Sequence, residues 1–333
     1  MEKTDQETAL CTLCPRMCRA NRVENETGIC GQTRELMVAR AALHMWEEPC
    51  ISGERGSGAV FFSGCALRCV FCQNHEIADG QRGKKITIER LSEIFLELEA
   101  QGANNINLVT AAHFVPQVIR ALDLARQQGL TLPVVYNTSG YENVETLRML
   151  EGYVDVYLPD FKYVGRNLSA RYSHAPDYFE RVSLALEEMV RQTGTARFHA
   201  EEEIRSGCWR KKEGFSAQMY QEKDGYQKKG MPLIMTRGVI VRHLLLLGCG
   251  EDSKKVIRYL LSTYRDRIFL SIMNQYTPLP HVKAYPELDR RIGRGEYERI
   301  IAYALELGWE NGFIQEGKTA EESFIPPFDE TGV

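Results

Sequence analysis

The chain has 333 residues, 44% of them hydrophobic and 26% charged, so it can bury a large core in one domain or two. A net charge of −4 gives no reason to expect nucleic acid or an anionic membrane surface as a partner. The start "MEKTDQETAL" lacks the basic and apolar parts of a signal peptide, and no apolar run approaches the roughly 20 residues that span a bilayer. We therefore expect a cytoplasmic protein whose ten cysteines are metal ligands or reactive thiols, not disulfides.

Four cysteines, Cys11, Cys14, Cys18 and Cys30, mark residues 1–58 as a small cysteine-rich extension ahead of the main domain. Four thiolates that begin with C-x2-C can close a tetrahedral zinc site or hold an iron–sulfur cluster with no open corner. The spacing is compatible with either zinc or an iron–sulfur cluster. A bound metal would fasten a segment too short to fold alone, whereas a cluster could relay electrons to a second centre.

Beyond residue 58, short apolar runs alternate with longer amphipathic ones. Six strand–helix units in strict alternation predict an α/β fold, a parallel sheet with helices outside it. The expected strands are 59–65, 105–110, 132–140, 154–163, 237–248 and 268–278, and the expected helices are 88–102, 115–129, 143–152, 177–194, 252–266 and 296–308. A last strand at 312–317 would close the edge, so the main domain spans 59–317 and a C-terminal tail spans 318–333.

Residues 197–235 interrupt this alternation between the fourth helix and the fifth strand. A connection of that length is functional or disordered more often than it is a simple link. Its mixed charge and scattered aromatic residues predict little core of its own. It is either a flap over the site or a solvated insertion.

Three further cysteines, Cys65, Cys69 and Cys72, crowd the loop after the first strand with the spacing C-x3-C-x2-C, and Phe71 stands before the last. A cubane [4Fe–4S] cluster has four iron corners, so three thiolates would leave one iron open to another ligand. A zinc site would need a fourth ligand, for which His75 is the nearby candidate. The spacing favours the cluster.

Polar residues also follow the other strands, at the edge where parallel α/β sheets and barrels place their sites. His113 follows the second strand and is expected to face the mouth of the site, where it touches substrate or caps the next helix.

The run "GCALRCVFCQN" resembles the signature of radical S-adenosylmethionine (radical SAM) enzymes. With "YNTSG", "LPDFK" and "VIVRHLLLLG" it is similar to glycyl-radical activating enzymes of the pyruvate formate-lyase type, and closest to a subgroup of pyruvate formate-lyase activating enzyme-like proteins. This resemblance implies a partial (β/α)6 barrel with the cysteine-rich extension as a metal-binding addition. It implies a [4Fe–4S] cluster on the three loop cysteines, with S-adenosylmethionine on the open iron.

The resemblance also implies a set of cofactor contacts. An amide and a carboxylate would hold the ribose or a cation, and Lys162 or Arg242 would pair with the carboxylate of S-adenosylmethionine. The family's second strand ends in a glycine-rich "GGE", which here reads "NINLVT", so Asn107 and Thr110 would supply substitute hydrogen bonds. Asn137 stands where the activating enzymes have Asp. The implied contacts are Phe71, Asn74, Asn107, Thr110, Asn137, Asp160, Lys162 and Arg242.

The stretch "LHMWEEP" (43–49) carries His44, Glu47 and Glu48, which could form a general acid and base. Radical chemistry needs no protein base, since the deoxyadenosyl carbon takes the hydrogen. We therefore interpret this stretch as a connector that packs Trp46.

The function implied is an anaerobic oxidoreductase that cleaves S-adenosylmethionine reductively and abstracts hydrogen from a glycine of a partner glycyl-radical enzyme. Flavodoxin or ferredoxin would donate the electron. One alternative keeps the radical chemistry but acts on another peptide or on a small molecule. A second alternative is a zinc-binding interaction protein without catalysis.

Overall fold

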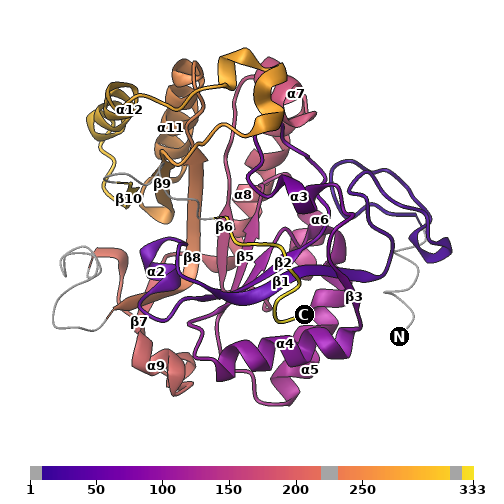
Figure 1. Ribbon diagram of the computed structural model, residues 1–333. Coiled ribbons are helices and arrows are strands. Elements are labelled where there is room, and N and C mark those ends of the chain that lie inside the picture. Colours follow the sequence, from indigo (N-terminus) through magenta and orange to yellow (C-terminus); the bar gives the residue numbers. More distant parts are fainter. Residues whose placement is uncertain (1–9, 219–231, 316–324) are drawn as a thin grey trace.

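The computed structural model describes residues 10–218, 232–315 and 325–333 (Figure 1). Its centre is a sheet with the strand order β10-β9-β8-β6-β5-β4-β2-β1-β3, and β7 pairs with β8 off this path. The strands from β2 to β10 along this order are parallel, and helices pack against their outer face. The strands are β1 (Leu36–His44), β2 (Ser57–Phe62), β3 (Lys84–Ile86), β4 (Ile106–Val109), β5 (Val134–Thr138), β6 (Val156–Pro159), β7 (Arg197–Ala200), β8 (Leu233–Leu244), β9 (Phe269–Met273) and β10 (Gly312–Ile314). The predicted parallel α/β sheet, consistent with a partial barrel, is confirmed.

The helices begin and end close to the positions that the amphipathic pattern predicts. Thr87 caps α4 by accepting a hydrogen bond from the backbone N–H of Arg90, and Pro116 lies in the first turn of α5, where its missing N–H has no helical partner to lose. The α-helices are α2 (Pro49–Ser52), α3 (His75–Ala78), α4 (Ile88–Ala100), α5 (Val115–Gln127), α6 (Val144–Met149), α7 (Arg166–Ser173), α8 (Tyr178–Thr193), α9 (Glu201–Arg205), α11 (Gly250–Tyr264) and α12 (Arg294–Glu306). Short 3-10 turns cover Arg22–Glu24, Ala112–Phe114, Cys208–Lys211, Arg265–Arg267, Pro280–Ala284 and Pro286–Leu288. Within the described residues, no helix is both long and apolar enough to cross a membrane.

The parallel strands are apolar on both faces because both faces are covered. The residues of β2, β4, β5 and β6 are all buried. One set of alternating side chains packs against the outer helices, and the other set points to the concave inner face. Two-sided burial explains why these strands are apolar runs rather than alternating polar and apolar residues.

Part of the expected N-terminal extension belongs to the sheet. Strand β1 lies antiparallel to β2, with His44 opposite Ser57 and Val38 opposite Phe62, and β3 pairs with the start of β1. After β1 the chain turns inward, and Cys50 and Ile51 of α2 are fully buried against inner-face residues of the parallel strands. This segment closes the floor of the barrel beneath the site.

The interpretation of residues 197–235 as a segment with little core is wrong for its described part. Strand β7 pairs antiparallel with the first residues of β8, and the side chains of Phe198, Ile204 and Trp209 are buried. The Trp209 indole donates to the carbonyl of Thr131, which precedes β5. The segment therefore packs at the amino ends of the strands, opposite the predicted site. Residues 219–231 lie outside the described residues.

Residues 325–333, which we call the strap, run along the sheet beside β1 (Figure 1, yellow). Thr331 accepts a hydrogen bond from the backbone of Ala41, and Glu330 donates one to Ala39. These pairings lie next to the part of β1 that β3 occupies. The strap therefore continues that edge of the sheet.

Candidate active site

The three loop cysteines leave the carboxyl end of β2 and lie within electrostatic range of one another. Burial raises the pKa of Cys69 to about 11, and burial with the neighbouring Cys65 and Cys69 thiols raises the pKa of Cys72 further. Three thiolates so close together repel one another in a buried place, and a cationic centre among them would remove that repulsion. The donor set therefore fits an iron–sulfur centre. The backbone turns into the loop at Gly64 with φ +90°, where a side chain would collide with the carbonyl of Cys30.

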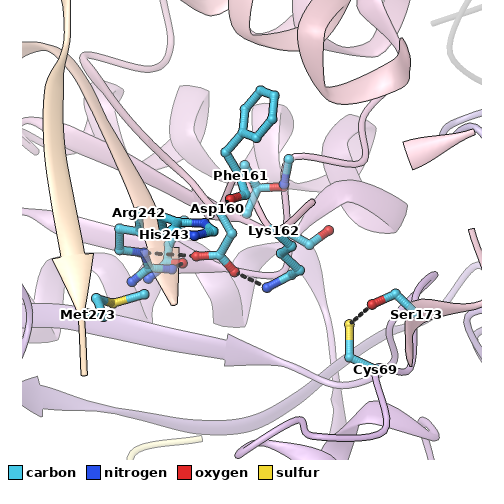
Figure 2. Close-up of polar contacts among 12 residues, drawn as sticks. Cys69, Asp160, Phe161, Lys162, Ser173, Arg242, His243 and Met273 are labelled. Atoms are coloured by element: carbon cyan, nitrogen blue, oxygen red, sulfur yellow. Dashed lines mark hydrogen bonds and ion pairs between the residues drawn. The ribbon is translucent and has the colours of Figure 1, made fainter. Parts of the chain in front are cut away.

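Asp160, at the end of β6, joins two cations inside the barrel (Figure 2). Arg242 Nε lies 3.1 Å from one carboxylate oxygen of Asp160, and the ammonium of Lys162 pairs with the other. Burial alone would raise the pKa of Asp160, but Lys162 and Arg242 outweigh burial and hold that pKa below its ordinary value. Burial would lower the pKa of Lys162, but Asp160 and the thiols of Cys69 and Cys72 raise it above its ordinary value. The three groups are therefore charged at neutral pH.

Glu47 is a member of this network that the sequence interpretation missed. One of its oxygens accepts hydrogen bonds from Asn107 at 3.0 Å and Asn137 at 3.1 Å, and the other pairs with Arg242 at 3.2 Å. Its side chain is 8% exposed. The stretch 43–49 is therefore not a mere connector, and Trp46, which we expected to be buried, is 59% exposed. Glu47 also brings a carboxylate to the amide of Asn137.

A cavity of about 200 Å³ lies between the cysteine loop and the ion network. Six of the eight implied cofactor contacts line it, together with two of the three loop cysteines, Cys69 and Cys72. They come from the loop after β2 and from strands β5, β6 and β8, which meet at one edge of the sheet. The implied contacts that line the cavity are Phe71, Asn74, Asn137, Asp160, Lys162 and Arg242, and its further lining includes Glu47, Gln73, Met273, Ile325 and Pro326.

The remaining two implied contacts do not reach the cavity wall. Asn107 is fully buried and holds Glu47, while its own amide oxygen has no partner among the described residues. Thr110 has φ +61° and donates its backbone N–H to Asn137 at 2.9 Å. A β-branched residue rarely adopts this conformation, which costs on the order of 1–2 kcal/mol. Asn107 and Thr110 therefore shape the residues that line the cavity and do not line it themselves.

Phe71 and its neighbours hold the cysteine loop against the barrel. The ammonium of Lys162 lies 5.9 Å from the centre of the Phe71 ring, and the ring packs edge-on against Tyr163. Ser173, in the last turn of α7, donates to the sulfur of Cys69 at 3.0 Å (Figure 2). The sequence interpretation missed Ser173, because α7 was not among the predicted helices.

Tyr178 connects the loops that follow β5 and β6, and the sequence interpretation did not identify it. Its hydroxyl lies 2.8 Å from the carbonyl of Ser139 and 2.9 Å from that of Asp160, and it accepts the backbone N–H of Lys162. A buried hydroxyl with this many backbone contacts fixes the ends of β5 and β6.

Of the three histidines in the sequence interpretation, His44 lines the cavity, whereas His113 and His75 do not. His113 is buried with its Nε2 2.7 Å from the carbonyl of Ser63, just before the cysteine loop, and burial lowers its pKa to about 3. It therefore supports the start of the loop and does not face the mouth. His75 begins the short helix α3 and is exposed.

The N-terminal cysteines lie close to the loop that carries Cys65, Cys69 and Cys72. Burial raises the pKa of Cys30, and the thiols of Cys11 and Cys18 raise it further, so the quartet is gathered in one place. Arg16, within the quartet, reaches the carbonyl of Ala66 at 2.8 Å and that of Ser173 at 3.2 Å. The extension thus contacts the backbone of the cysteine loop and the backbone of Ser173, whose hydroxyl donates to Cys69.

Among the residues that the structure describes, no three His, Cys, Asp or Glu side chains are arranged to hold a single metal ion. A cubane spreads its thiolates farther apart than a single ion does, because each sulfur binds a different iron.

Comparison with known proteins agrees with this chemistry. Residues 59–195 match the Radical SAM superfamily. The chain is 26% identical over 301 residues to the uncharacterized protein MJ0674 of Methanocaldococcus jannaschii, and the match covers 88% of this chain and 74% of that protein.

Two crystal structures of Streptococcus suis SuiB, one bound to S-adenosylmethionine and one to the precursor peptide SuiA, each match with a TM-score of 0.42 at 10% identity over 73% of this chain. The match covers 44% and 43% of the two SuiB chains, so this chain spans less than half their length. The superfamily match over residues 59–195 includes the three loop cysteines, and it implies a [4Fe–4S] cluster and S-adenosylmethionine as cofactors.

Proposed function

We propose that this protein generates a radical from S-adenosylmethionine and uses it to abstract hydrogen from the α-carbon of a glycine in a partner glycyl-radical enzyme. The observation that carries the radical chemistry is the convergence of Cys69 and Cys72 with Asp160, Lys162 and Arg242 around one cavity. The cluster, when bound, supplies the electron that splits the sulfonium into methionine and a 5′-deoxyadenosyl radical. The glycine partner is supported by the sequence motifs.

Different residues of the cavity would bind different parts of S-adenosylmethionine. We assign the amino-acid end of S-adenosylmethionine to Lys162, whose ammonium is close enough to Cys69 and Cys72 for their thiolates to raise its pKa. Arg242 is less available, because its three nitrogens already reach Asp160, Glu47 and Asn137. Arg242 therefore orients the carboxylate and amide that would hold the ribose.

Exclusion of water is the other task of the protein, because a carbon radical must meet only its substrate. The floor beneath the cavity is closed by Cys50 and Ile51 of α2. Phe71 covers Lys162 on the cluster side. The deoxyadenosyl carbon takes the hydrogen itself, so no side chain needs to act as a base.

We also propose the quartet of Cys11, Cys14, Cys18 and Cys30 as a second metal site, holding zinc or a second cluster. Its support is the crowding of four thiols in a segment that braces the cluster loop. Removing that metal should loosen the loop as well as the extension.

The test is anaerobic reconstitution with iron and sulfide, followed by reduction with dithionite in the presence of S-adenosylmethionine. We expect 5′-deoxyadenosine, with about four irons per chain if the quartet holds zinc and about eight if it holds a cluster. A glycyl radical detected by electron paramagnetic resonance in an added glycyl-radical enzyme would support the partner. Deoxyadenosine without that radical would favour another peptide or a small molecule as the substrate. Bound zinc without deoxyadenosine would contradict the proposed radical chemistry.

A further inference from the structure

The strap adds an extended polypeptide to the barrel at the edge of the active site. Its backbone pairs with β1 through the N–H of Ala41, which donates to Thr331 at 2.9 Å, and through Glu330, which donates to Ala39 at 3.1 Å. Two backbone hydrogen bonds from alternate residues of β1 are the pattern of strand addition. Such pairing recognises any extended backbone and does not depend on the strap's own sequence.

Two side chains give the strap its register. The ring of Phe328 packs edge-on against Phe61, with 5.6 Å between ring centres, and Phe61 lines the site cavity. Asp329 pairs with Arg40 at 2.6 Å, and the same guanidinium donates to the carbonyl of Pro327 at 3.1 Å. One apolar anchor and one cation therefore fix where a polypeptide sits on this edge.

The strap leads directly into the active site. Ile325 and Pro326 form part of the wall of the cavity that also contains Cys69 and Cys72. That cavity measures about 200 Å³, below the roughly 300–1,000 Å³ typical of ligand sites. With the strap in place, the cavity is too small for a nucleoside cofactor together with a second reactant.

The strap is held mainly by contacts near the surface: its backbone pairs with β1, and Lys84 and Arg90 donate to the carbonyls of Val333 and Gly332. All of its residues are exposed or half-buried, and in its ion pair with Arg40 the side chain of Asp329 is 53% exposed. Segments with few buried contacts open at a small fraction of the global stability. An incoming polypeptide of matching register would compete for the same contacts.

We propose that the strap marks a binding track for an extended polypeptide substrate. The substrate would pair with β1 in place of the strap, put an apolar side chain on Phe61, and carry its reacting residue to the position of Pro326. This inference rests on the proposed function, because it supposes a substrate that is a polypeptide.

The first test measures binding of a fluorescent peptide with the sequence IPPFDETGV to the reconstituted, full-length protein. A double variant, Phe328→Ala with Asp329→Ala, releases the strap and should bind the peptide about tenfold more tightly than the parent chain. Glu330→Gln is the matched control, since it removes a charge from the strap without touching either anchor. It should bind the peptide as the parent does.

If the double variant and the parent bind the peptide with equal affinity, the strap does not mark a binding site for a polypeptide. If the double variant fails to fold, Asp329→Asn should still tighten binding, by a smaller factor. Amide exchange at Ala41 reports the release directly, because its N–H is donated to the strap. Faster exchange without tighter peptide binding would also count against the inference.

The second test asks whether a peptide on the track reacts. A peptide with α-deuterated glycine in place of Pro326 is added with dithionite and S-adenosylmethionine. The carbon–deuterium bond should break, with deuterium entering the methyl group of 5′-deoxyadenosine and a radical left on the glycine. A peptide deuterated instead at Gly332, at the far end of the track, should transfer none.

The outcomes separate the two proposals. No deoxyadenosine from any preparation would overturn the proposed function, whatever the peptide affinities. Deoxyadenosine without deuterium from either peptide would overturn the track and leave the radical chemistry standing.

Discussion

Replacing Glu47 by Gln tests whether this buried carboxylate organises the active site. The change keeps the size of the side chain and one oxygen, which can still accept from Asn107 and Asn137. The other position becomes an amide N–H that faces the guanidinium of Arg242, so two donors meet and an ion pair is lost. The alternative amide orientation places the N–H group against the two asparagines instead, with the same conflict.

The size of the expected destabilisation depends on the hydrogen-bond and ion-pair partners that Arg242 retains in Glu47→Gln. Removing one partner of a buried ion pair costs about 3–5 kcal/mol when the other charge is left alone. Arg242 retains Asp160 at 3.1 Å and the amide oxygen of Asn137 at 2.6 Å. We therefore expect Glu47→Gln to lower the free energy of unfolding by about 2–3 kcal/mol. Because the same change loosens Asn137, the dissociation constant for S-adenosylmethionine should rise about tenfold.

The adjacent Glu48→Gln is a matched control. Glu48 is buried, burial raises its pKa, and one of its oxygens has no partner among the described residues. Replacing it removes a carboxylate that is costly to ionise, so the change in unfolding free energy should be below about 1 kcal/mol. Urea denaturation of the metal-free protein and equilibrium binding to the reconstituted protein measure the two effects. If Glu48→Gln destabilises as much as Glu47→Gln, or if Glu47→Gln leaves both quantities unchanged, the network does not organise the site.

Three other expectations address separate parts of the molecule. Cys69→Ala should abolish deoxyadenosine formation while reducing stability by only about 1 kcal/mol, because it loses one hydrogen bond from Ser173; turnover in that variant would refute the cluster assignment. Phe198→Ala should reduce the free energy of unfolding by about 3–5 kcal/mol without changing affinity for S-adenosylmethionine, since this buried ring lies away from the cavity, and a weaker affinity would contradict that separation. Burial raises the pKa of Glu142 to about 7 from 4.5, so its contribution to stability is full below pH 4.5 and lost as the pH rises through 7. Between pH 5 and 8 the free energy of unfolding of the parent should fall by up to about 3 kcal/mol relative to that of Glu142→Gln. If the free energies of unfolding of the two proteins change with pH in parallel, this carboxyl is not buried as described.

The sequence predicted the sheet because its physical signals are local. Parallel strands covered on both faces are short apolar runs, and "NINLVT" and "VDVYLPDFKY" contain such runs where β4 and β6 lie. The helices between them show the 3.6-residue period of surfaces that are half buried. These patterns fixed the order of the strands along the chain, and the carboxyl ends of parallel strands must share an edge. Asn137, Asp160 and Arg242 could therefore be placed together before the structure was known.

The same reasoning failed where a residue's role depends on partners far away in the chain. Glu47 meets Arg242 across 195 positions only because the chain turns inward after β1 and α2 closes the floor. Nothing in "LHMWEEP" signals this, since an exposed connector would have the same composition. The described part of 197–235 misled for a similar reason, because Phe198 and Trp209 become core residues only through pairing with β8 and packing on the end of β5.

Sequence alone determined the chemistry and the scaffold of this protein. The spacing of Cys65, Cys69 and Cys72 within one loop indicates three thiolates for a cluster, and the alternation of strands and helices supplies the edge on which that loop sits. Only the tertiary structure decided which polar groups complete the site and what closes it. The carboxylate of Glu47 and the strap at 325–333 are far from the cysteines in the chain, and burial and backbone pairing that no local pattern encodes bring them to the same cavity.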